Sequence, residues 1–339
     1  YGTFSLSVTD KAGKNTVSED YNIAISPVMS LNANPWNAFA HRISGVSASV
    51  TNGYAEKLSL EYSTDGNDWL TAPAGAVSGE SISFGIIEQL LPDTEYQLRL
   101  KYDGKAYMVT EPLKLRTEEP LQVENASMDE WGHMDTNLYY PGPEYNTYWA
   151  TRNTQTTSSG VSTWYCRNSG TYSSSDAVSG NAALLTTVGW GSGNTWAGFI
   201  FSAIINNISP AFLALGSSDT SGNITAKGVP FESRPDAVTF FCKYIPKNGS
   251  IWEARVEVLS GDSVIGSASM SSGDAVNSYT KQTLDIVYSD NTKKATALYL
   301  YFTNDNRNRS YSKDDLEKAS NPDRYQGSIL LLDDIALVY

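Results

Sequence analysis

Hydrophobic and polar residues alternate with a period of two over many short stretches of this chain, a pattern typical of half-buried β-strands. The first run contains Phe4, Leu6 and Val8, and a second run follows the turn at Asp10–Lys14. Two strands alone are only marginally stable in water. We therefore expect residues 1–27 to be the terminal hairpin of a truncated immunoglobulin-like domain, or extra strands that pack on the next domain.

Residues 28–118 continue this alternation and contain a characteristic corner. The segment Leu90–Tyr96 (LLPDTEY) resembles the L-x-P-x-T-x-Y corner of fibronectin type III domains, which it matches at Leu90, Pro92, Thr94 and Tyr96. The resemblance implies a β-sandwich in which the hydroxyl of Tyr96 hydrogen-bonds to the backbone just upstream, and in which Trp69 is buried after the third strand. It implies little about function, because such sandwiches host many roles.

A charged linker ending in proline, Arg116–Pro120, precedes one larger unit, residues 119–339, made of short strands and loops rich in Ser, Gly and Asn. The strands expected in this unit are Ala182–Val188, Phe199–Ile204, Ala237–Ile245, Trp252–Leu259, Gln282–Val287, Ala297–Thr303 and Ile329–Val338. Only Asp314–Ala319 is expected to form a helical turn. The pattern as a whole predicts an all-β fold, with an immunoglobulin or fibronectin III-like sandwich followed by a larger jelly-roll β-sandwich.

Composition narrows the classes of partner. The chain has 24 Lys and Arg against 37 Asp and Glu, a net charge of −13. This balance argues against nucleic acid and against anionic lipid surfaces, which both require basic patches. The longest apolar runs fall short of the roughly 18 residues that a membrane-spanning helix needs, so we expect no direct membrane insertion.

The sequence starts at Tyr1 inside a strand-like pattern and without Met. We therefore expect a longer precursor, whose missing N-terminal segment carried the targeting signal and the anchor. Cys166 and Cys242 are too few for a disulfide scaffold. Both lie in strand-like runs of the larger unit, where they either form one bridge or remain two buried thiols.

Four separated landmarks in residues 120–339 resemble one family. They are, in chain order, Asn125–Trp131, Tyr148–Ala150 with Asn153, Phe231–Pro246 and Gly327–Ile335. The third is part of Gly228–Pro246, where a proline-containing turn runs into an apolar strand. Together they resemble the carbohydrate metabolism domain of Bacteroidetes surface lipoproteins. The resemblance implies a jelly-roll carbohydrate-binding module that is extracellular or on the outer-membrane surface, held away from the membrane by fibronectin-like spacers.

The same resemblance suggests a structural calcium ion. In related jelly rolls two acidic positions hold calcium together with backbone carbonyls, and the matching positions here are Asp129 and Asp333, with Met128 and Asp129 in place of the usual Phe and Glu. Calcium takes six to eight oxygen ligands, so two carboxylates and several carbonyls form a chemically sensible site. The alternative is that Asp333 only accepts backbone N–H bonds from a neighbouring loop.

Loop-like segments around residues 149 and 190 place aromatic residues beside polar ones. A pyranose stacks its C–H face on an aromatic ring, and its hydroxyls need amides, carboxylates or guanidinium groups nearby. The expected carbohydrate-binding residues are therefore Trp149, Trp190, Tyr148, Asn153 and Arg234. For any single aromatic residue a place in the core is the commoner alternative, and Trp131 and Trp252 are assigned there. For Arg234 the alternative is an ion pair with Glu232 or Asp236 that holds its own loop.

The sequence marks out no catalytic centre. His41 and His133 stand beside no recognised Ser or Cys nucleophile motif, and no zinc or phosphate-binding spacing occurs. The carboxylates available to a glycosidase show no paired spacing; they are Glu144, Asp176, Glu232, Asp236 and Glu253. The leading prediction is a non-catalytic cell-surface glycan-binding accessory protein whose partner is a polysaccharide or oligosaccharide. The alternatives are a glycoside hydrolase or lyase with a carboxylate pair in the jelly-roll cleft, and a structural adhesin-type module without sugar binding.

Overall fold

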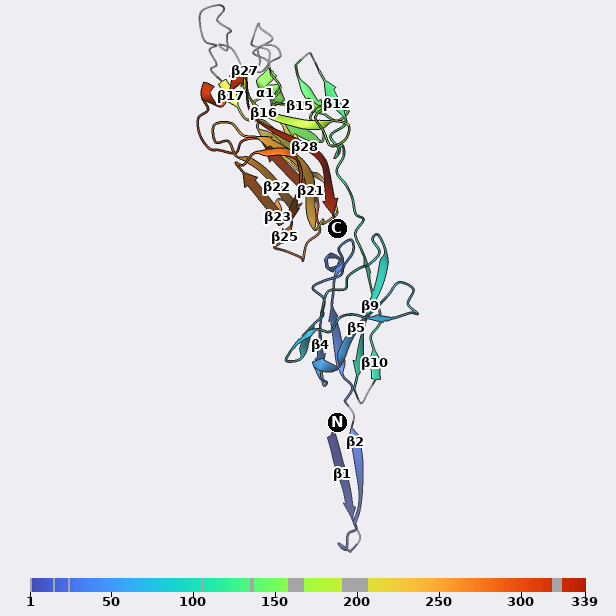
Figure 1. Ribbon diagram of the computed structural model, residues 1–339. Coiled ribbons are helices and arrows are strands. Elements are labelled where there is room, and N and C mark those ends of the chain that lie inside the picture. Colours follow the sequence, from blue (N-terminus) through green and yellow to red (C-terminus); the bar gives the residue numbers. More distant parts are fainter. Residues whose placement is uncertain are drawn as a thin grey trace, which may run out of the picture. The chain divides into compact units, whose positions relative to one another are not determined.

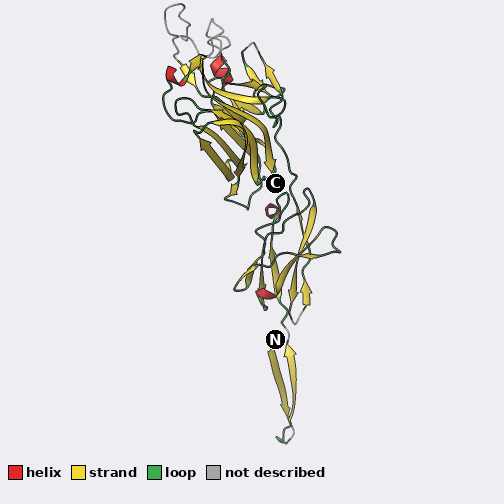
Figure 2. Cartoon of the chain, in the orientation of Figure 1, coloured by secondary structure: helices red, strands yellow, loops and turns green. Residues whose placement is uncertain are grey.

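The computed structural model describes residues 2–14, 16–23, 25–104, 107–134, 137–157, 168–190, 207–318 and 325–339. The chain divides into two compact units, Tyr1–Glu118 and Glu119–Tyr339, and the division falls inside the predicted linker. Almost all described elements are antiparallel strands (Figure 2), so the predicted all-β sandwich class is confirmed. No helix among the described residues is both long enough and apolar enough to cross a membrane.

The first two strands form a hairpin, with β1 (Gly2–Thr9) antiparallel to β2 (Thr16–Ile23). The carboxylate of Asp10 accepts the backbone N–H groups of Ala12 and Lys14 and so closes the turn. The side chains described in this hairpin are exposed to solvent, including those of Leu6, Val8 and Val17. For these side chains, packing on the next domain is not observed.

The rest of the first unit is a sandwich of two sheets. One sheet has the order β3 (Val28–Asn32), β4 (Ser47–Thr51), β8 (Ser81–Ser83), β7 (Ala76–Ser78). The other has the order β10 (Tyr107–Val109), β9 (Glu95–Asp103), β5 (Leu58–Ser63), β6 (Leu70–Thr71), with β11 (Leu113–Arg116) also paired to β9. Short 3₁₀ turns lie at Pro35–Asn37 and Ala55–Lys57. Alternate residues of the facing strands, such as Val50, Leu60 and Leu98, fill the core between the sheets.

The tyrosine corner is present, whereas the expectation for Trp69 is wrong. The hydroxyl of buried Tyr96 accepts the backbone N–H of Leu91 at 2.9 Å, as the resemblance implied. Trp69 is only partly buried, its indole N–H donates to the Gly66 carbonyl, and the guanidinium of Arg99 lies 3.8 Å from its ring centroid. Trp69 therefore covers the outer surface of the sheet, because Arg99 supplies the packing partner that the core was expected to supply.

Substitution Tyr96→Phe tests this corner. The N–H of Leu91 loses its acceptor, so we expect the first unit to lose about 1–2 kcal/mol of unfolding free energy. Urea unfolding followed by circular dichroism measures the change. Tyr62→Phe is the matched control, since the Tyr62 ring centroid lies 6.4 Å from that of Tyr96 and no hydrogen bond of its hydroxyl is described. Equal losses in the two variants would contradict a specific role for the corner.

The second unit contains two larger sheets. An eight-stranded sheet has the order β14 (Trp149–Thr151), β18 (Phe212–Ser218), β26 (Ala297–Thr303), β22 (Trp252–Ser260), β23 (Ser263–Ser272), β25 (Val287–Tyr288), with β19 (Ile224–Lys227) on β18 and β20 (Val229–Pro230) on β26. A seven-stranded sheet has the order β15 (Thr171–Ser174), β16 (Ala182–Trp190), β28 (Tyr325–Val338), β21 (Ala237–Ile245), β24 (Val276–Asp285), with β17 (Asn207–Ser209) on β16 and β27 (Glu317–Lys318) on β28. A separate ribbon pairs β12 (Trp131–His133) with β13 (Tyr139–Pro141), and α1 spans Asn153–Thr157.

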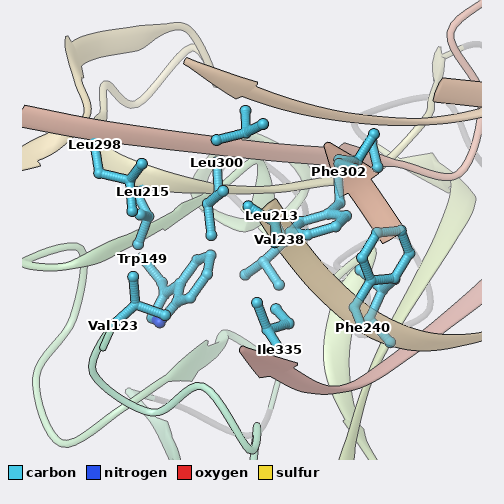
Figure 3. Packing of buried hydrophobic residues seen from close by; sticks show 14 of the residues in the cluster. Val123, Trp149, Leu213, Leu215, Val238, Phe240, Leu298, Leu300, Phe302 and Ile335 are labelled. Carbon is cyan, nitrogen blue, oxygen red and sulfur yellow. The ribbon is translucent and has the colours of Figure 1, made fainter. Parts of the chain in front are cut away.

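The core of the second unit lies between these two sheets (Figure 1). Leu300 and Phe302 of β26 face it from one side, and Val238 and Phe240 of β21 face it from the other. Figure 3 shows these side chains packed together with Trp149. Because the side chains of a strand alternate between its faces, the odd-numbered neighbours on β26 point to the outer surface of the eight-stranded sheet.

Most of the strand predictions in this unit hold, whereas one predicted strand and the predicted helical turn differ from the structure. Ala237–Ile245 and Ala297–Thr303 have the predicted limits, while Phe199–Ile204 lies outside the described residues. The predicted strand Gln282–Val287 is interrupted, because β24 ends at Asp285 in one sheet and β25 begins at Val287 in the other. The predicted helical turn is a single 3₁₀ turn at Lys313–Asp315, after which Glu317 and Lys318 pair with β28 instead.

Candidate functional site

Trp149 was predicted to present a stacking face to a sugar, and the structure contradicts this. Only 2% of its surface is exposed, and the indole packs in the core close to Val123 and Leu215 (Figure 3). Its indole N–H donates to the carbonyl of Glu124 at 2.9 Å. The ring is buried because Trp149 is the first residue of β14 and points into the core, so its face is not available for stacking on a sugar.

Trp190 and Asn153 also have structural partners. Trp190 ends β16, is partly exposed, and its indole N–H donates to the Ser209 hydroxyl at 2.9 Å. Asn153 is fully buried, and its side chain donates to the carbonyls of Tyr139 and Thr171 while it accepts the N–H of Thr171. A sugar ligand for Asn153 is therefore ruled out by burial, since its amide is fully used to join three chain segments.

Arg234 is wrong as a sugar-binding residue for the same reason. Only 1% of its surface is exposed, and the loop from Phe231 to Pro235 that carries it is largely buried beside β21. The Pro235 carbonyl accepts a hydrogen bond from the hydroxyl of Tyr288, and the following Asp236 N–H donates to Val338. The stretch Gly228–Pro246 is thus a packed connection between the sheets, which explains its sequence pattern without a ligand.

The two aspartates of the expected calcium site hold one loop. Asp333 is fully buried, and its carboxylate accepts the N–H groups of Val178, Ser179 and Asp334. Asp129 accepts the N–H of Asn181 at 2.8 Å in the same loop. Burial raises the pKa of Asp333, and these hydrogen bonds oppose that rise.

This arrangement is the alternative stated for Asp333, and its N–H donors do not fit a calcium ion, which needs oxygen ligands there. Among the described residues, no three His, Cys, Asp or Glu side chains are grouped to hold a metal ion. Structural calcium at Asp129 and Asp333 stays a prediction, which a calcium titration followed by thermal unfolding would test.

Cys242 is a free, buried thiol on β21, and burial raises its pKa to about 11. Cys166 lies outside the described residues.

Two of the predicted residues, Tyr148 and the almost fully buried Trp149, line an open hollow. The cavity has a volume of about 410 Å³ and is formed by three segments that come together before β12, after β13 and at β14. Its lining consists of Glu124, Asn125, Glu130, Pro141, Gly142, Pro143, Glu144, Thr147, Tyr148 and Trp149. Ligand cavities of proteins commonly have volumes of about 300–1,000 Å³, so this one can hold a small ligand.

The segment Glu124–Glu130 forms the first wall of this cavity, and the side chain of Asn125 holds it in place. Its amide donates to the carbonyl of Glu130 and accepts the N–H of the same residue, which closes the turn between them. Asn125 and Met128 both have positive φ angles, and the fully buried Met128 anchors the turn in the core. The last strand adds a further bond, from the Ile335 N–H to the Ala126 carbonyl. The opening landmark of this unit therefore serves as a rigid wall.

The segment Pro141–Tyr148 forms the second wall, and the side chain of Asn146 holds it in a similar way. Its amide donates to the carbonyl of Ser218 and accepts the N–H of Ser218, so the loop after β13 is joined to the end of β18. Gly142 has a φ of +93°, which glycine adopts at little cost, and its N–H donates to Glu130. Burial raises the pKa of Tyr148, and a hydrogen bond with the Glu124 backbone opposes this rise.

The electrostatic character of the cavity is acidic. Glu124, Glu130 and Glu144 are exposed at its rim, and the described structure contains no ion pair of these three carboxylates. None of the described residues that line it is Lys, Arg or His. Carboxylates accept hydrogen bonds and repel anions, so the cavity suits a ligand that is rich in hydroxyl or amino donors.

Sequence reasoning identified Tyr148 and mentioned Glu144 but missed Glu124, Glu130 and Asn125 as parts of one cavity. The motif around Asn125 was noted only for its resemblance to a family. The other carboxylates considered for catalysis lie elsewhere: Asp176 pairs with Lys243 at 2.6 Å, and Glu253 pairs with Arg255 at 2.6 Å.

Comparisons with known proteins add little. No family model and no curated protein match this chain. Among solved structures, a Stig cyclase from Fischerella sp. TAU is 14% identical, and the match covers 65% of this chain and 97% of the cyclase with a TM-score of 0.23. The secreted serine protease VesC from Vibrio cholerae is 10% identical over 88% of this chain and 48% of its own, with a TM-score of 0.22. At such TM-scores these similarities carry no argument about fold or function.

Proposed function

We propose that this protein binds glycans without cleaving them, and that the Tyr148 cavity takes a neutral or amino sugar residue. The observation that carries the proposal is the composition of the cavity. An aromatic side chain and prolines form an apolar wall, and three carboxylates with one amide form a rim of hydrogen-bonding groups. A pyranose has the same division, with a C–H face and a ring of hydroxyl groups.

The family resemblance of residues 120–339 supports this proposal, since it implies a carbohydrate-binding module of a Bacteroidetes surface lipoprotein. In that setting the protein is extracellular or on the outer-membrane surface, and the first unit is a fibronectin-like spacer. The acidic rim adds a preference: uronic acids and sulfated sugars are repelled, whereas neutral and amino sugars are accepted.

The test is binding of the full chain to a glycan array and to polysaccharide affinity gels, followed by titration calorimetry with the best ligand. Tyr148→Ala is expected to weaken binding about tenfold, which corresponds to about 1.4 kcal/mol, because the stacking wall is removed. Tyr54→Ala is the matched control, since Tyr54 is an exposed tyrosine of the first unit. Absence of retention on every neutral and amino glycan would refute the proposal and favour an adhesin-type module.

A second candidate is a glycoside hydrolase or lyase, because the cavity brings Glu144 together with Glu124 and Glu130. Glycosidases use two carboxylates placed on either side of the scissile bond. Incubation with labelled oligosaccharides distinguishes the two candidates. Product release that Glu144→Gln or Glu130→Gln abolishes, with binding retained, would establish the enzyme.

A further inference from the structure

The Tyr148 cavity is lined by three carboxylates that form no ion pair within the described parts of the chain. They belong to Glu124, Glu130 and Glu144, which are all exposed to solvent. Elsewhere in this unit, carboxylates of the sheets and their loops pair with Lys or Arg side chains. Since the described lining of the cavity contains no cationic side chain, its negative charge is not balanced from within.

The backbone that carries two of these carboxylates is held in place from both walls. The carbonyl of Glu130 accepts hydrogen bonds from the side-chain amide of Asn125 at 2.9 Å and from the N–H of Gly142 at 2.7 Å, so Glu130 lies where the two walls meet. The carbonyl of Glu124 accepts the indole N–H of Trp149 at 2.9 Å. A ligand that binds these carboxylates therefore needs no rearrangement of the backbone, which favours affinity.

The size of the cavity and its apolar wall together define the ligand. A round cavity of 410 Å³ is about 9 Å across, close to the Debye length of about 8 Å at physiological salt, so the repulsion among the three carboxylates is only partly screened. A bound cation relieves this repulsion, whereas a neutral group does not. The ring of Tyr148 and the neighbouring prolines require an apolar face in addition, which a small hydrated cation lacks.

We propose that the Tyr148 cavity selects amino sugars with a free, protonated amino group, such as glucosamine residues, over neutral and N-acetylated sugars. This inference rests on the proposed glycan binding and narrows its ligand to one class. The C–H face of the pyranose packs on Tyr148, and the ammonium group donates its three N–H bonds toward the carboxylates of the lining. Acetylation removes the positive charge, so an N-acetylated sugar keeps the stacking contact and loses the ionic one.

Titration calorimetry of the full chain at pH 6 with four matched probes tests this selection. Triglucosamine, triacetylchitotriose and cellotriose share one β-1,4-linked backbone and differ at carbon 2, while spermidine carries three amines and no sugar ring. An aliphatic amine with a pKa of about 8 is protonated at pH 6. We expect triglucosamine to bind about tenfold more tightly than each of the other three, because it alone combines the charge with the apolar face.

Removal of single charges locates the effect in the cavity. Glu130→Gln and Glu144→Gln should each weaken triglucosamine binding up to about fivefold, as for a partly exposed ion pair, and should leave cellotriose binding unchanged. Asp262→Asn is the matched control, since Asp262 is exposed in the turn between β22 and β23 and does not line the cavity. An equal loss in the control would assign the effect to the overall net charge of −13 and contradict the proposal.

The charge of the ligand provides a readout that needs no variant. At pH 9 the amine loses most of its protons while the carboxylates of the protein stay ionised, so the advantage of triglucosamine over cellotriose should largely disappear. An advantage that is the same at pH 6 and pH 9 would contradict an ionic contact.

Two further outcomes would overturn this proposal. Equal affinities for cellotriose and triglucosamine at pH 6 would leave glycan binding intact and remove the role of the ammonium group. Equal affinities for spermidine and triglucosamine would remove the role of the sugar ring. If none of the three trisaccharides bound, the proposed glycan binding would fail as well, so the failure of this selection and the failure of the proposed function are told apart.

Discussion

Trp149→Ala is expected to lower the unfolding free energy of the second unit by about 3–5 kcal/mol, the usual cost of truncating a buried Trp to Ala. The indole is 2% exposed and packs among aliphatic side chains of the core (Figure 3). Truncation leaves a cavity there and also removes the donor to the Glu124 carbonyl. Since that bond joins β14 to the first wall of the Tyr148 cavity, glycan binding should weaken as well. Guanidinium chloride unfolding of the full chain, followed by circular dichroism, measures the loss.

Trp69→Ala is the control for this experiment. Trp69 is partly exposed and packs under Arg99 on the outer surface of the first unit, so its removal should cost much less and should leave glycan binding unchanged. A loss below 1 kcal/mol for Trp149→Ala would mean that the indole is not packed in the core, and it would restore Trp149 as a ligand-facing residue.

Asp333→Ala is expected to destabilise the second unit by about 3 kcal/mol or more, because three backbone N–H groups lose their acceptor at once and each buried unpaired donor costs about 1–3 kcal/mol. The donors belong to Val178, Ser179 and Asp334. Urea unfolding measures the total effect. Hydrogen exchange of the Val178 and Ser179 amides localises it, since both should lose protection.

Asp176→Ala is the matched control on the neighbouring segment. The Asp176 side chain is 54% exposed and pairs with Lys243 at the surface, and exposed pairs of this kind contribute about 0–1 kcal/mol. If Asp333→Ala cost no more than Asp176→Ala, the hydrogen bonds of Asp333 would be replaceable by water, and a cation-binding role would become the better explanation for its burial.

The strands were well predicted where the local pattern carries the information. Ala237–Ile245 is bounded by turns and proline and has an apolar, β-branched composition, and it is a strand with these limits. The tyrosine corner is similarly local, because the hydroxyl of Tyr96 bonds only five residues away, to Leu91. The prediction of one continuous strand was wrong near Ile286, where the chain passes from one sheet to the other. The sequence pattern of this segment does not show the crossing, because the crossing depends on which neighbouring strands the two halves pair with.

Three of the predicted binding residues, Trp149, Asn153 and Arg234, were wrong because burial cannot be inferred from polar neighbours in the sequence. Trp149 and Tyr148 are adjacent in the same polar segment, yet the side chain of Trp149 is buried in the core and that of Tyr148 is partly exposed, since neighbouring residues of an extended segment point to opposite faces. Asn153 and Arg234 are polar and nevertheless buried. The amide of Asn153 is used by carbonyl and N–H groups from segments 14 and 18 residues away, which the sequence does not connect.

By itself the sequence determined the all-β class, most strand limits in the larger unit, the tyrosine corner and the acidic net charge. These depend on periodicity, turn residues and charge, which act over a few residues or over the whole surface. Only the tertiary structure decided which aromatic rings are accessible and which carboxylates share the Tyr148 cavity. Each of these depends on contacts between segments that are distant in the chain, and such contacts form only when the two sheets pack around their common core.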